Sequence, residues 1–243
     1  MIGRAGLALL LLITVAGCEN KPRTDEDVPS KDFPAAHRPV APIVSSRYST
    51  EEARDRLKEA DRVMREAGIR PGMTVADIGA GEGYYTVRLA AKVGEDGRVV
   101  AQDVVPAVRD KLADRVTREE LDNVSVKLGE PADPKLPPNS FDRIFMMHMY
   151  HEISAPYEFL WRLRPSLAPK GRVVVIDADR PIIEHGTPAA LLDCEFNAVG
   201  YRLVERRPMP EVDGYVALFE AVGARPEPRT IVPCKGPPKT KTP

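Results

Sequence analysis

Hydrophobic and polar positions change period in a regular way along the middle of the chain. Seven segments have the length and apolar content of buried strands: 74–78, 98–102, 124–128, 141–147, 172–176, 201–205 and 215–222. Segments with the helical spacing of apolar residues precede or follow several of them: 52–67, 84–93, a segment that begins at Pro106, 157–167 and 187–199. Strands that alternate with helices predict an α/β domain in which a mostly parallel sheet is covered by helices on both faces.

The predicted domain covers residues 49–222 and is flanked by two segments of different composition. Ser49 and Glu52 have the spacing of a capping box, so the first helix is expected to begin there. Residues 18–48 and 223–243 are rich in proline and charged side chains, and neither segment can bury enough surface to fold alone. We therefore expect a proline-rich linker before the domain and a disordered tail after it.

Residues 1–17 have the pattern of an export signal. Arg4 precedes the apolar run 7–16, which is too short to span a bilayer comfortably. The sequence Val-Ala-Gly-Cys at 15–18 resembles the bacterial lipobox, in which the cysteine is lipidated and the preceding peptide is removed. The resemblance implies a signal peptide and a lipid anchor on Cys18 in the bacterial cell envelope. The alternatives are an uncleaved membrane anchor with an incidental cysteine, and a domain held at the cytoplasmic face of the inner membrane.

Charge and cysteine content exclude some classes of partner. The chain has 35 basic and 36 acidic residues and a formal net charge of −1, so it offers no positive field for nucleic acid. Its cysteines, Cys18, Cys194 and Cys234, have no spacing that indicates a zinc site or a disulfide framework, so we expect no metal. Cys194 and Cys234 could pair if the protein is exported, but two cysteines do not establish a bridge.

The segment 77–83 reads Asp-Ile-Gly-Ala-Gly-Glu-Gly and directly follows a predicted strand. Glycines at alternate positions allow left-handed backbone angles and let the chain approach a nucleoside closely while the next helix begins beneath it. The dinucleotide fingerprint needs its third glycine one position later, where Tyr84 stands. The loop therefore predicts a site for a nucleoside cofactor and disfavours a nicotinamide oxidoreductase.

This segment resembles motif I of class I S-adenosylmethionine-dependent methyltransferases, and the seven-strand order resembles their whole domain. The resemblance implies a Rossmann-like sheet whose last strand is antiparallel, with S-adenosylmethionine as the cofactor. The residues that it places against the methionine part and the ribose of the cofactor are Asp77, Gly79, Ala80, Gly81 and Gly83.

Four further cofactor positions follow from the same resemblance. An acid at the end of the second strand binds both ribose hydroxyls in that family, and Asp103 stands there, followed by Val104 beside the adenine. A carboxylate suits this task because it can accept two hydrogen bonds from a vicinal diol. For the adenine amino group the first candidate is Glu130 and the second is Asp133, because Pro131 makes this loop depart from the family's commoner Gly-Asp-Ala form.

Polar residues after the fourth predicted strand are the candidates for catalysis. His148, His151 and Glu152 leave the carboxyl end of this strand, where ligands bind in open α/β sheets. The resemblance places His148 beside the cofactor, while His151 or Glu152 could take a proton from an oxygen or nitrogen nucleophile. The alternative is that His148 caps the strand, Tyr150 packs over the cofactor and His151 faces solvent. Residues 184–186 either border the substrate entrance or form an ordinary exposed loop.

Two functions from different classes remain open. The first is a methyltransferase that acts on a small molecule, because the predicted core has no inserted domain for recognising protein or nucleic acid. The second is a non-catalytic, nucleoside-binding envelope lipoprotein that keeps the fold, because an exported enzyme would be separated from a cofactor made in the cytoplasm. Asp77, the three glycines and Asp103 occur together, which favours retained activity. The sequence does not specify the methyl acceptor or the oligomeric state.

Overall fold

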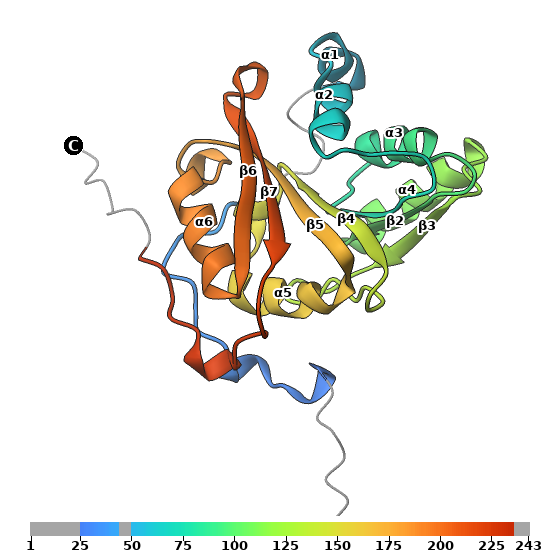
Figure 1. Ribbon diagram of the computed structural model, residues 1–243. Coiled ribbons are helices and arrows are strands. Elements are labelled where there is room, and N and C mark those ends of the chain that lie inside the picture. The colour runs from blue at the N-terminus through green and yellow to red at the C-terminus, as the bar shows by residue number, and fades with distance from the viewer. Residues whose placement is uncertain (1–24, 44–49, 236–243) are drawn as a thin grey trace, which may run out of the picture.

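Figure 1 shows the computed structural model of the chain, in which residues 25–43 and 50–235 are described. The predicted signal peptide and the predicted lipid attachment at Cys18 lie outside these residues. Within the two described ranges, no helix has both the length and the apolar character that crossing a membrane requires.

Seven strands within residues 50–235 form one sheet in the order β3-β2-β1-β4-β5-β7-β6. Their bounds are Thr74–Ile78 (β1), Arg98–Asp103 (β2), Val124–Leu128 (β3), Phe141–Met147 (β4), Leu167–Ala178 (β5), Tyr201–Met209 (β6) and Gly214–Ala221 (β7). The pairs among β1 to β5 are parallel, and β7 runs antiparallel to both β5 and β6. This topology confirms the predicted Rossmann-like, mostly parallel sheet with an antiparallel last strand.

Helices lie on both faces of the sheet, as predicted (Figure 1). In the described part of the chain the α-helices are Glu51–Arg56 (α1), Glu59–Glu66 (α2), Tyr84–Val93 (α3), Pro106–Arg118 (α4), Pro156–Leu163 (α5) and Ala189–Ala198 (α6). One apolar core joins α2 and α3 to the sheet, and a second joins α5 and α6 to the opposite face. Short 3-10 helices occupy Asp25–Asp27, Ser30–Asp32, Tyr150–Glu152, Arg164–Ser166, Ile182–Glu184, Pro210–Val212 and Pro228–Thr230.

The central strands are buried on both faces because successive side chains of a strand point to opposite sides. Val75 and Phe145 belong to the core beneath α2 and α3, whereas Ala76 and Ile144 belong to the core beneath α5 and α6. All four side chains are completely buried. Such near-continuous apolar strands are typical of parallel sheets, and they leave the polar chemistry to the loops at the strand ends.

The single first helix predicted for residues 52–67 is wrong, because the chain breaks it into α1 and α2. Lys58 adopts a left-handed conformation with φ of 53°, which ends one helix and begins the next in a new direction. The N-cap of α1 is Thr50, whose hydroxyl accepts a hydrogen bond from the backbone N–H of Ala53 at 3.3 Å, while Ser49 lies outside the described residues. The break brings Glu59 to the wall of the cavity described below.

The expectation of an unfolded N-terminal linker is wrong for residues 25–43, which pack on the domain. The guanidinium of Arg38 is buried and donates to the carboxylate of Glu195 on α6 at 2.8 Å and to the backbone carbonyl of Ile153 at 3.1 Å. Ala41 is buried, and its backbone N–H donates to the carbonyl of His151 at 3.1 Å. The segment is too polar to fold alone, but α6 and its neighbours supply the partners that it lacks.

The expectation of a disordered C-terminal tail is also wrong for residues 225–235. A disulfide joins Cys194 on α6 to Cys234, and the backbone N–H of Cys234 donates to the hydroxyl of Tyr157 at 2.7 Å. Residues 25–43 and 225–235 lie side by side on this side of the domain, where His37 and Lys235 form a parallel bridge (Figure 1). A covalent link and hydrogen bonds to helices therefore order a segment whose composition alone indicates disorder.

Candidate functional site

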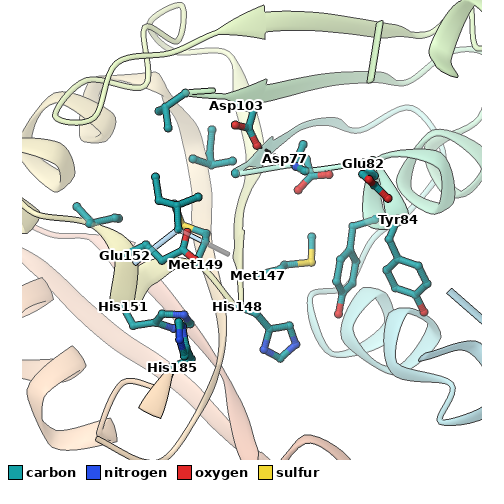
Figure 2. A pocket seen from close by; sticks show the side chains of 18 of the residues that line it. Asp77, Glu82, Tyr84, Asp103, Met147, His148, Met149, His151, Glu152 and His185 are labelled. Carbon is teal, nitrogen blue, oxygen red and sulfur yellow. Dashed lines mark hydrogen bonds between the residues drawn. The ribbon is translucent and has the colours of Figure 1, made fainter. Parts of the chain in front are cut away.

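A cavity of about 1000 Å³ opens at the carboxyl ends of the central strands. Its walls come from the loops after β1, β2, β4 and β5, from α1 and α2, and from Ile43 at the end of the N-terminal segment. Figure 2 shows Asp77 and Asp103 on one side of this cavity and His151 and His185 on the other. Most of the predicted cofactor residues and all three predicted catalytic residues therefore line one cavity.

The glycine loop after β1 has the left-handed backbone that its composition predicts. Gly79 and Gly81 have φ of 66° and 57° and line the cavity together with Ala80. A side chain on Gly79 would come within 3.0 Å of Met149, whereas nothing lies within 4 Å of the position that a side chain on Gly81 would take. The loop is therefore open toward a ligand at Gly81 and closely packed at Gly79.

Gly83, which the resemblance also assigned to the cofactor, does not line the cavity. It has φ of 88° and is the N-cap of α3, and a Cβ atom there would lie 2.5 Å from Leu112 on α4. The glycine is needed so that the two helices can approach each other closely. Its role in this structure is packing, and its contact with the cofactor stays a prediction.

Asp103, the last residue of β2, fixes the glycine loop from the opposite side. One carboxylate oxygen accepts the backbone N–H of Gly81 at 3.0 Å, and the other accepts that of Val105 at 2.9 Å. A carboxylate has about four acceptor positions, so two remain for a ligand in the cavity. Val104 also lines the cavity, and its position beside the adenine stays a prediction.

Asp77, the residue before the last of β1, is buried. Burial raises its pKa to about 6, against the opposing hydrogen bond from the hydroxyl of Thr86 at 2.6 Å, and the nearby charge of Asp103 raises it further. The two carboxylates therefore make this end of the cavity negative near neutral pH, which favours a cationic ligand.

Gln102 is a cavity residue that the sequence analysis missed. Its side chain is almost fully buried, and its amide nitrogen has no hydrogen-bond partner among the described residues. The amide nitrogen lies 1.3 Å from the position that a Cβ on Gly129 would occupy, so only glycine leaves room for it. The other end of the amide, Oε1, accepts the backbone N–H of Gly79 at 3.5 Å, so Gln102 supports the glycine loop.

The structure does not place Glu130 and Asp133, the two candidates for the adenine amino group, in the cavity. Both carboxylates lie near the ammonium group of Lys135, at 3.7 and 3.2 Å, and only Pro131 of this loop lines the cavity. The backbone N–H groups of Glu130 and Asp133 donate to each other's carbonyl oxygens, at 2.9 and 3.1 Å, and close a tight turn. Neither side chain lines the cavity in this structure, and the adenine contact stays a prediction.

Glu59 is the centre of a group of cavity residues that the sequence analysis missed. Its carboxylate accepts hydrogen bonds from the guanidinium of Arg54 at 2.7 Å and from the hydroxyl of Tyr85, and it lies 3.1 Å from the imidazole of His148. Burial alone would raise the pKa of Glu59, but His148 and then Arg54 lower it below its ordinary value. The signal that could have indicated this group is a glutamate between apolar positions of the first predicted helix, five residues after Arg54.

His148 directly follows β4 in a left-handed conformation with φ of 55°. Its backbone N–H donates to the carbonyl of Ile176 at 2.8 Å, and its ring lies in the cavity. Left-handed angles are uncommon for residues other than glycine, and when they occur they often mark functional positions. His148 therefore ends the strand and also presents its imidazole to the cavity.

His151 does not face solvent, contrary to the alternative considered above. Only 3% of the residue is exposed, and its Nδ1 lies 3.0 Å from both carboxylate oxygens of Asp177 at the end of β5. Asp177 also accepts a hydrogen bond from the hydroxyl of Thr187 at 2.6 Å and another from the backbone N–H of Ala178 at 2.9 Å. Asp177 therefore holds the ring of His151 and is itself held by two hydrogen bonds, and no pattern in the sequence indicates this pair.

The remaining predicted residues divide between the cavity and its surroundings. Glu152 and His185 line the cavity, whereas Glu184 is exposed outside it. Tyr150 does not pack over the cofactor position, because it is fully buried and its hydroxyl donates to Glu195 at 2.7 Å. Of residues 184–186, which were expected to border the substrate entrance, only His185 lines the cavity.

Comparison with known proteins agrees with this geometry. Residues 75–171 match the methyltransferase domain family. Relatives in Salmonella arizonae and Teredinibacter turnerae, both ubiquinone/menaquinone biosynthesis C-methyltransferases, are each 27% identical over 175 residues, which is 68% of this chain. The matched region spans 65% and 66% of the length of these two relatives.

Solved structures show the same fold. An S-adenosylmethionine-dependent methyltransferase from Aquifex aeolicus is 26% identical, with a TM-score of 0.62 over 71% of this chain and 98% of its own. The [4+2]-cyclase SpnF has a TM-score of 0.58 over 80% of this chain and 90% of its own, but at 19% identity this likeness concerns the fold alone.

The cavity fits S-adenosylmethionine in three respects. Asp103 has free acceptor positions for a diol, Gly81 leaves open space, and the carboxylates of Asp77 and Asp103 suit a ligand that carries positive charge. The chain therefore has the class I methyltransferase fold, residues 75–171 match the methyltransferase domain family, and the cavity suits S-adenosylmethionine as the cofactor.

Proposed function

We propose that the protein transfers the methyl group of S-adenosylmethionine to a small-molecule acceptor that binds in the same cavity. The observation that carries this proposal is the continuity of the cavity from Asp103 and Gly81 to His151 and His185. Its volume of about 1000 Å³ is at the upper end of the roughly 300–1,000 Å³ that is usual for a pocket holding one small molecule. It has room for an acceptor beside the cofactor.

The lining of the cavity suits an acceptor that is partly apolar and carries an ionisable hydroxyl. Its apolar wall residues include Ile43, Leu57, Ile153 and Phe159, and three histidines line the same cavity. The curated relatives carry names that assign them to quinone biosynthesis. We therefore propose an aromatic acceptor with a ring hydroxyl, whose ring would contact the apolar wall while the hydroxyl meets the imidazoles.

The proposed chemistry needs alignment of the two ligands and a group that removes the acceptor's proton. The cofactor supplies, when bound, an electrophilic methyl group on a sulfonium, and the electrons of the broken carbon–sulfur bond stay on sulfur. His148 accepts the proton of the acceptor, because its ring lies in the cavity and the carboxylate of Glu59, 3.1 Å away, holds that ring in place. Arg54 and Tyr85 hold that carboxylate in place.

Calorimetric titration with S-adenosylmethionine, and separately with NAD, tests the first half of the proposal. The protein should begin at Asp25, because residues 25–43 pack on the domain. We expect saturable binding of S-adenosylmethionine alone. A folded protein that binds neither compound would instead support the non-catalytic lipoprotein.

Methyl transfer from labelled S-adenosylmethionine to a panel of hydroxylated aromatic compounds tests the second half. His148→Asn should retain cofactor binding and lose turnover, because asparagine fills similar space but cannot take up the proton. Full turnover by this variant would remove His148 from the mechanism.

We also propose that the domain works in an oxidising compartment, tethered to the cell envelope through a lipid on Cys18. The disulfide between Cys194 and Cys234 supports this location, because such bonds persist outside the reducing cytoplasm. An exported domain then needs S-adenosylmethionine to reach it across the membrane, and the alternative at the cytoplasmic face avoids that need.

Thiol alkylation in intact cells distinguishes the two locations. A membrane-permeant maleimide should label Cys194 and Cys234 only after reduction if the domain is outside, and without reduction if it is inside. Labelled palmitate should be incorporated into the wild type and not into Cys18→Ala. A wild type that incorporates no lipid would argue for an uncleaved anchor.

A further inference from the structure

Three metal-ligating side chains converge on the side of the cavity opposite Asp103. His151 and Glu152 come from the 3-10 helix after β4, and His185 directly follows the 3-10 helix Ile182–Glu184 after β5. One ligand atom of each residue lies within 4.8 Å of the corresponding atoms of the other two. Figure 2 shows the three side chains in the same region of the cavity. Three donors at such mutual distances could surround a single ion with little movement.

The orientation of His151 is already that of a supported metal ligand. Its Nδ1 is engaged by Asp177 at 3.0 Å, which leaves Nε2 as the nitrogen that is available for coordination. Metal-binding histidines commonly bond through their second nitrogen to a carboxylate, which fixes the ring and strengthens the ligand. Asp177 is completely buried and accepts further hydrogen bonds from Thr187 and Ala178, so its own position is fixed as well.

His185 is held in position by its backbone. It has φ of 57°, a left-handed angle that is unfavourable for a residue with a side chain, and its ring meets that of His151 edge to face at 5.5 Å between centroids. Unfavourable backbone angles persist where the surrounding structure requires them, and they concentrate at functional sites. The loop after β5 therefore carries an imidazole to the same point as His151.

We propose that His151, Glu152 and His185 bind a divalent transition-metal ion, with zinc as the reference ion. Two imidazoles and one carboxylate form a donor set that suits zinc and its neighbours, whereas magnesium and calcium prefer oxygen ligands. The carboxylates of Glu152 and Asp177 offset the charge of the ion. The sequence expectation of no metal rested on cysteine spacing and could not detect these ligands.

A site with three protein ligands leaves at least one coordination position open to the cavity. That position suits an oxygen of the methyl acceptor, which the ion would orient and whose deprotonation it would favour. This role rests on the proposed function and leaves proton uptake to His148, whereas the binding of the metal does not depend on it. The ion would lie on the acceptor side, away from the glycine loop.

Metal binding is tested on the full-length protein, purified with a tag that contains no histidine and freed of metal with a chelator. We expect zinc to bind with a stoichiometry of one in calorimetry, and cobalt to give the visible absorption bands of a four- or five-coordinate ion. His151→Ala, Glu152→Gln and His185→Ala should each abolish stoichiometric binding. His37→Ala and Glu184→Gln are the matched controls, because both side chains are exposed and lie outside the cavity, and they should bind as the wild type does.

Asp177→Asn tests the supporting carboxylate. It should weaken zinc binding by about 10- to 100-fold and change the cobalt spectrum, while circular dichroism shows whether the variant is folded. Binding of S-adenosylmethionine is measured on every variant, which separates the two proposals. A folded wild-type protein that binds S-adenosylmethionine but not zinc or cobalt overturns the metal site alone. Zinc binding that survives in all three ligand variants also overturns it.

Discussion

The carboxylate of Asp103 accepts the backbone N–H of Gly81 at 3.0 Å, so the acid that ends β2 holds the glycine loop that follows β1. We expect Asp103→Asn to weaken S-adenosylmethionine binding by roughly 1.5–3 kcal/mol for each charge-assisted hydrogen bond lost. Each oxygen of the aspartate accepts one backbone N–H, from Gly81 or from Val105, and keeps one acceptor position for the ligand. Asparagine has a single acceptor oxygen, so the variant loses one of these backbone bonds and an acceptor position for the ligand.

Calorimetric affinity measures this effect, with Asp133→Asn as the control. Asp133 is the acid that lies outside the cavity near Lys135, so its replacement should leave cofactor affinity unchanged. Equal affinities for the wild type and Asp103→Asn would remove Asp103 from the ribose site.

Asp77 is expected to make folding less favourable as the pH rises. Its pKa is about 6 in the folded protein, against 3.8 for a solvated aspartate, because burial disfavours the charged form. Between these pH values the folded state keeps a proton that the unfolded state has lost. The stabilising contribution is therefore present below pH 3.8 and is lost as the pH rises through 6.

Asp77→Asn should consequently raise the free energy of unfolding at neutral pH by on the order of 1–3 kcal/mol, with a much smaller gain near the pKa of the solvated side chain. Urea unfolding of variant and wild type at the two pH values gives the difference. If the free energy of unfolding rises equally at both pH values, titration of Asp77 does not cause the increase. The variant should also bind S-adenosylmethionine less tightly, because it removes a negative charge from the cavity.

The left-handed backbone of His148 predicts an unusual order of stabilities. His148→Gly should be about 1 kcal/mol more stable than His148→Ala, because glycine adopts φ of 55° without steric cost. Both variants lose the same contact with Glu59, so their difference isolates the backbone. Thermal or urea unfolding measures it.

Asp114 supplies the opposite case for comparison, because it is exposed within α4. There the alanine variant should be more stable than the glycine variant by about 1 kcal/mol. If alanine is also preferred at position 148, His148 does not have the left-handed conformation in solution.

Arg38 is expected to be the main attachment of the N-terminal segment. Arg38→Met should cost about 3–5 kcal/mol, because it leaves the carboxylate of Glu195 buried without its positive partner. The double variant Arg38→Met, Glu195→Gln should recover much of that loss in urea unfolding. If the double variant is as unstable as the single one, the segment is held by contacts other than this ion pair.

The elements of the fold and the centre of the cofactor site could be predicted from the sequence, because their signals are local. The apolar runs of β1 and β4 are continuous, and the loop from Asp77 to Gly81 directly follows its strand. Asp103 could be found because it ends the next strand of a parallel sheet, whose carboxyl ends lie side by side. Each of these inferences needs only the order of residues along the chain and the periods of helices and strands.

The tertiary structure alone decided which distant side chains meet. Glu59 reaches His148 because Lys58 breaks the first helix, and Asp177 reaches His151 because β5 lies beside β4. Such pairs depend on topology and backbone direction, and neither leaves a periodic pattern in the sequence. Composition likewise predicted a disordered segment on each side of the domain. Residues 25–43 and 225–235 are ordered by contacts with α6 that only the folded domain can supply.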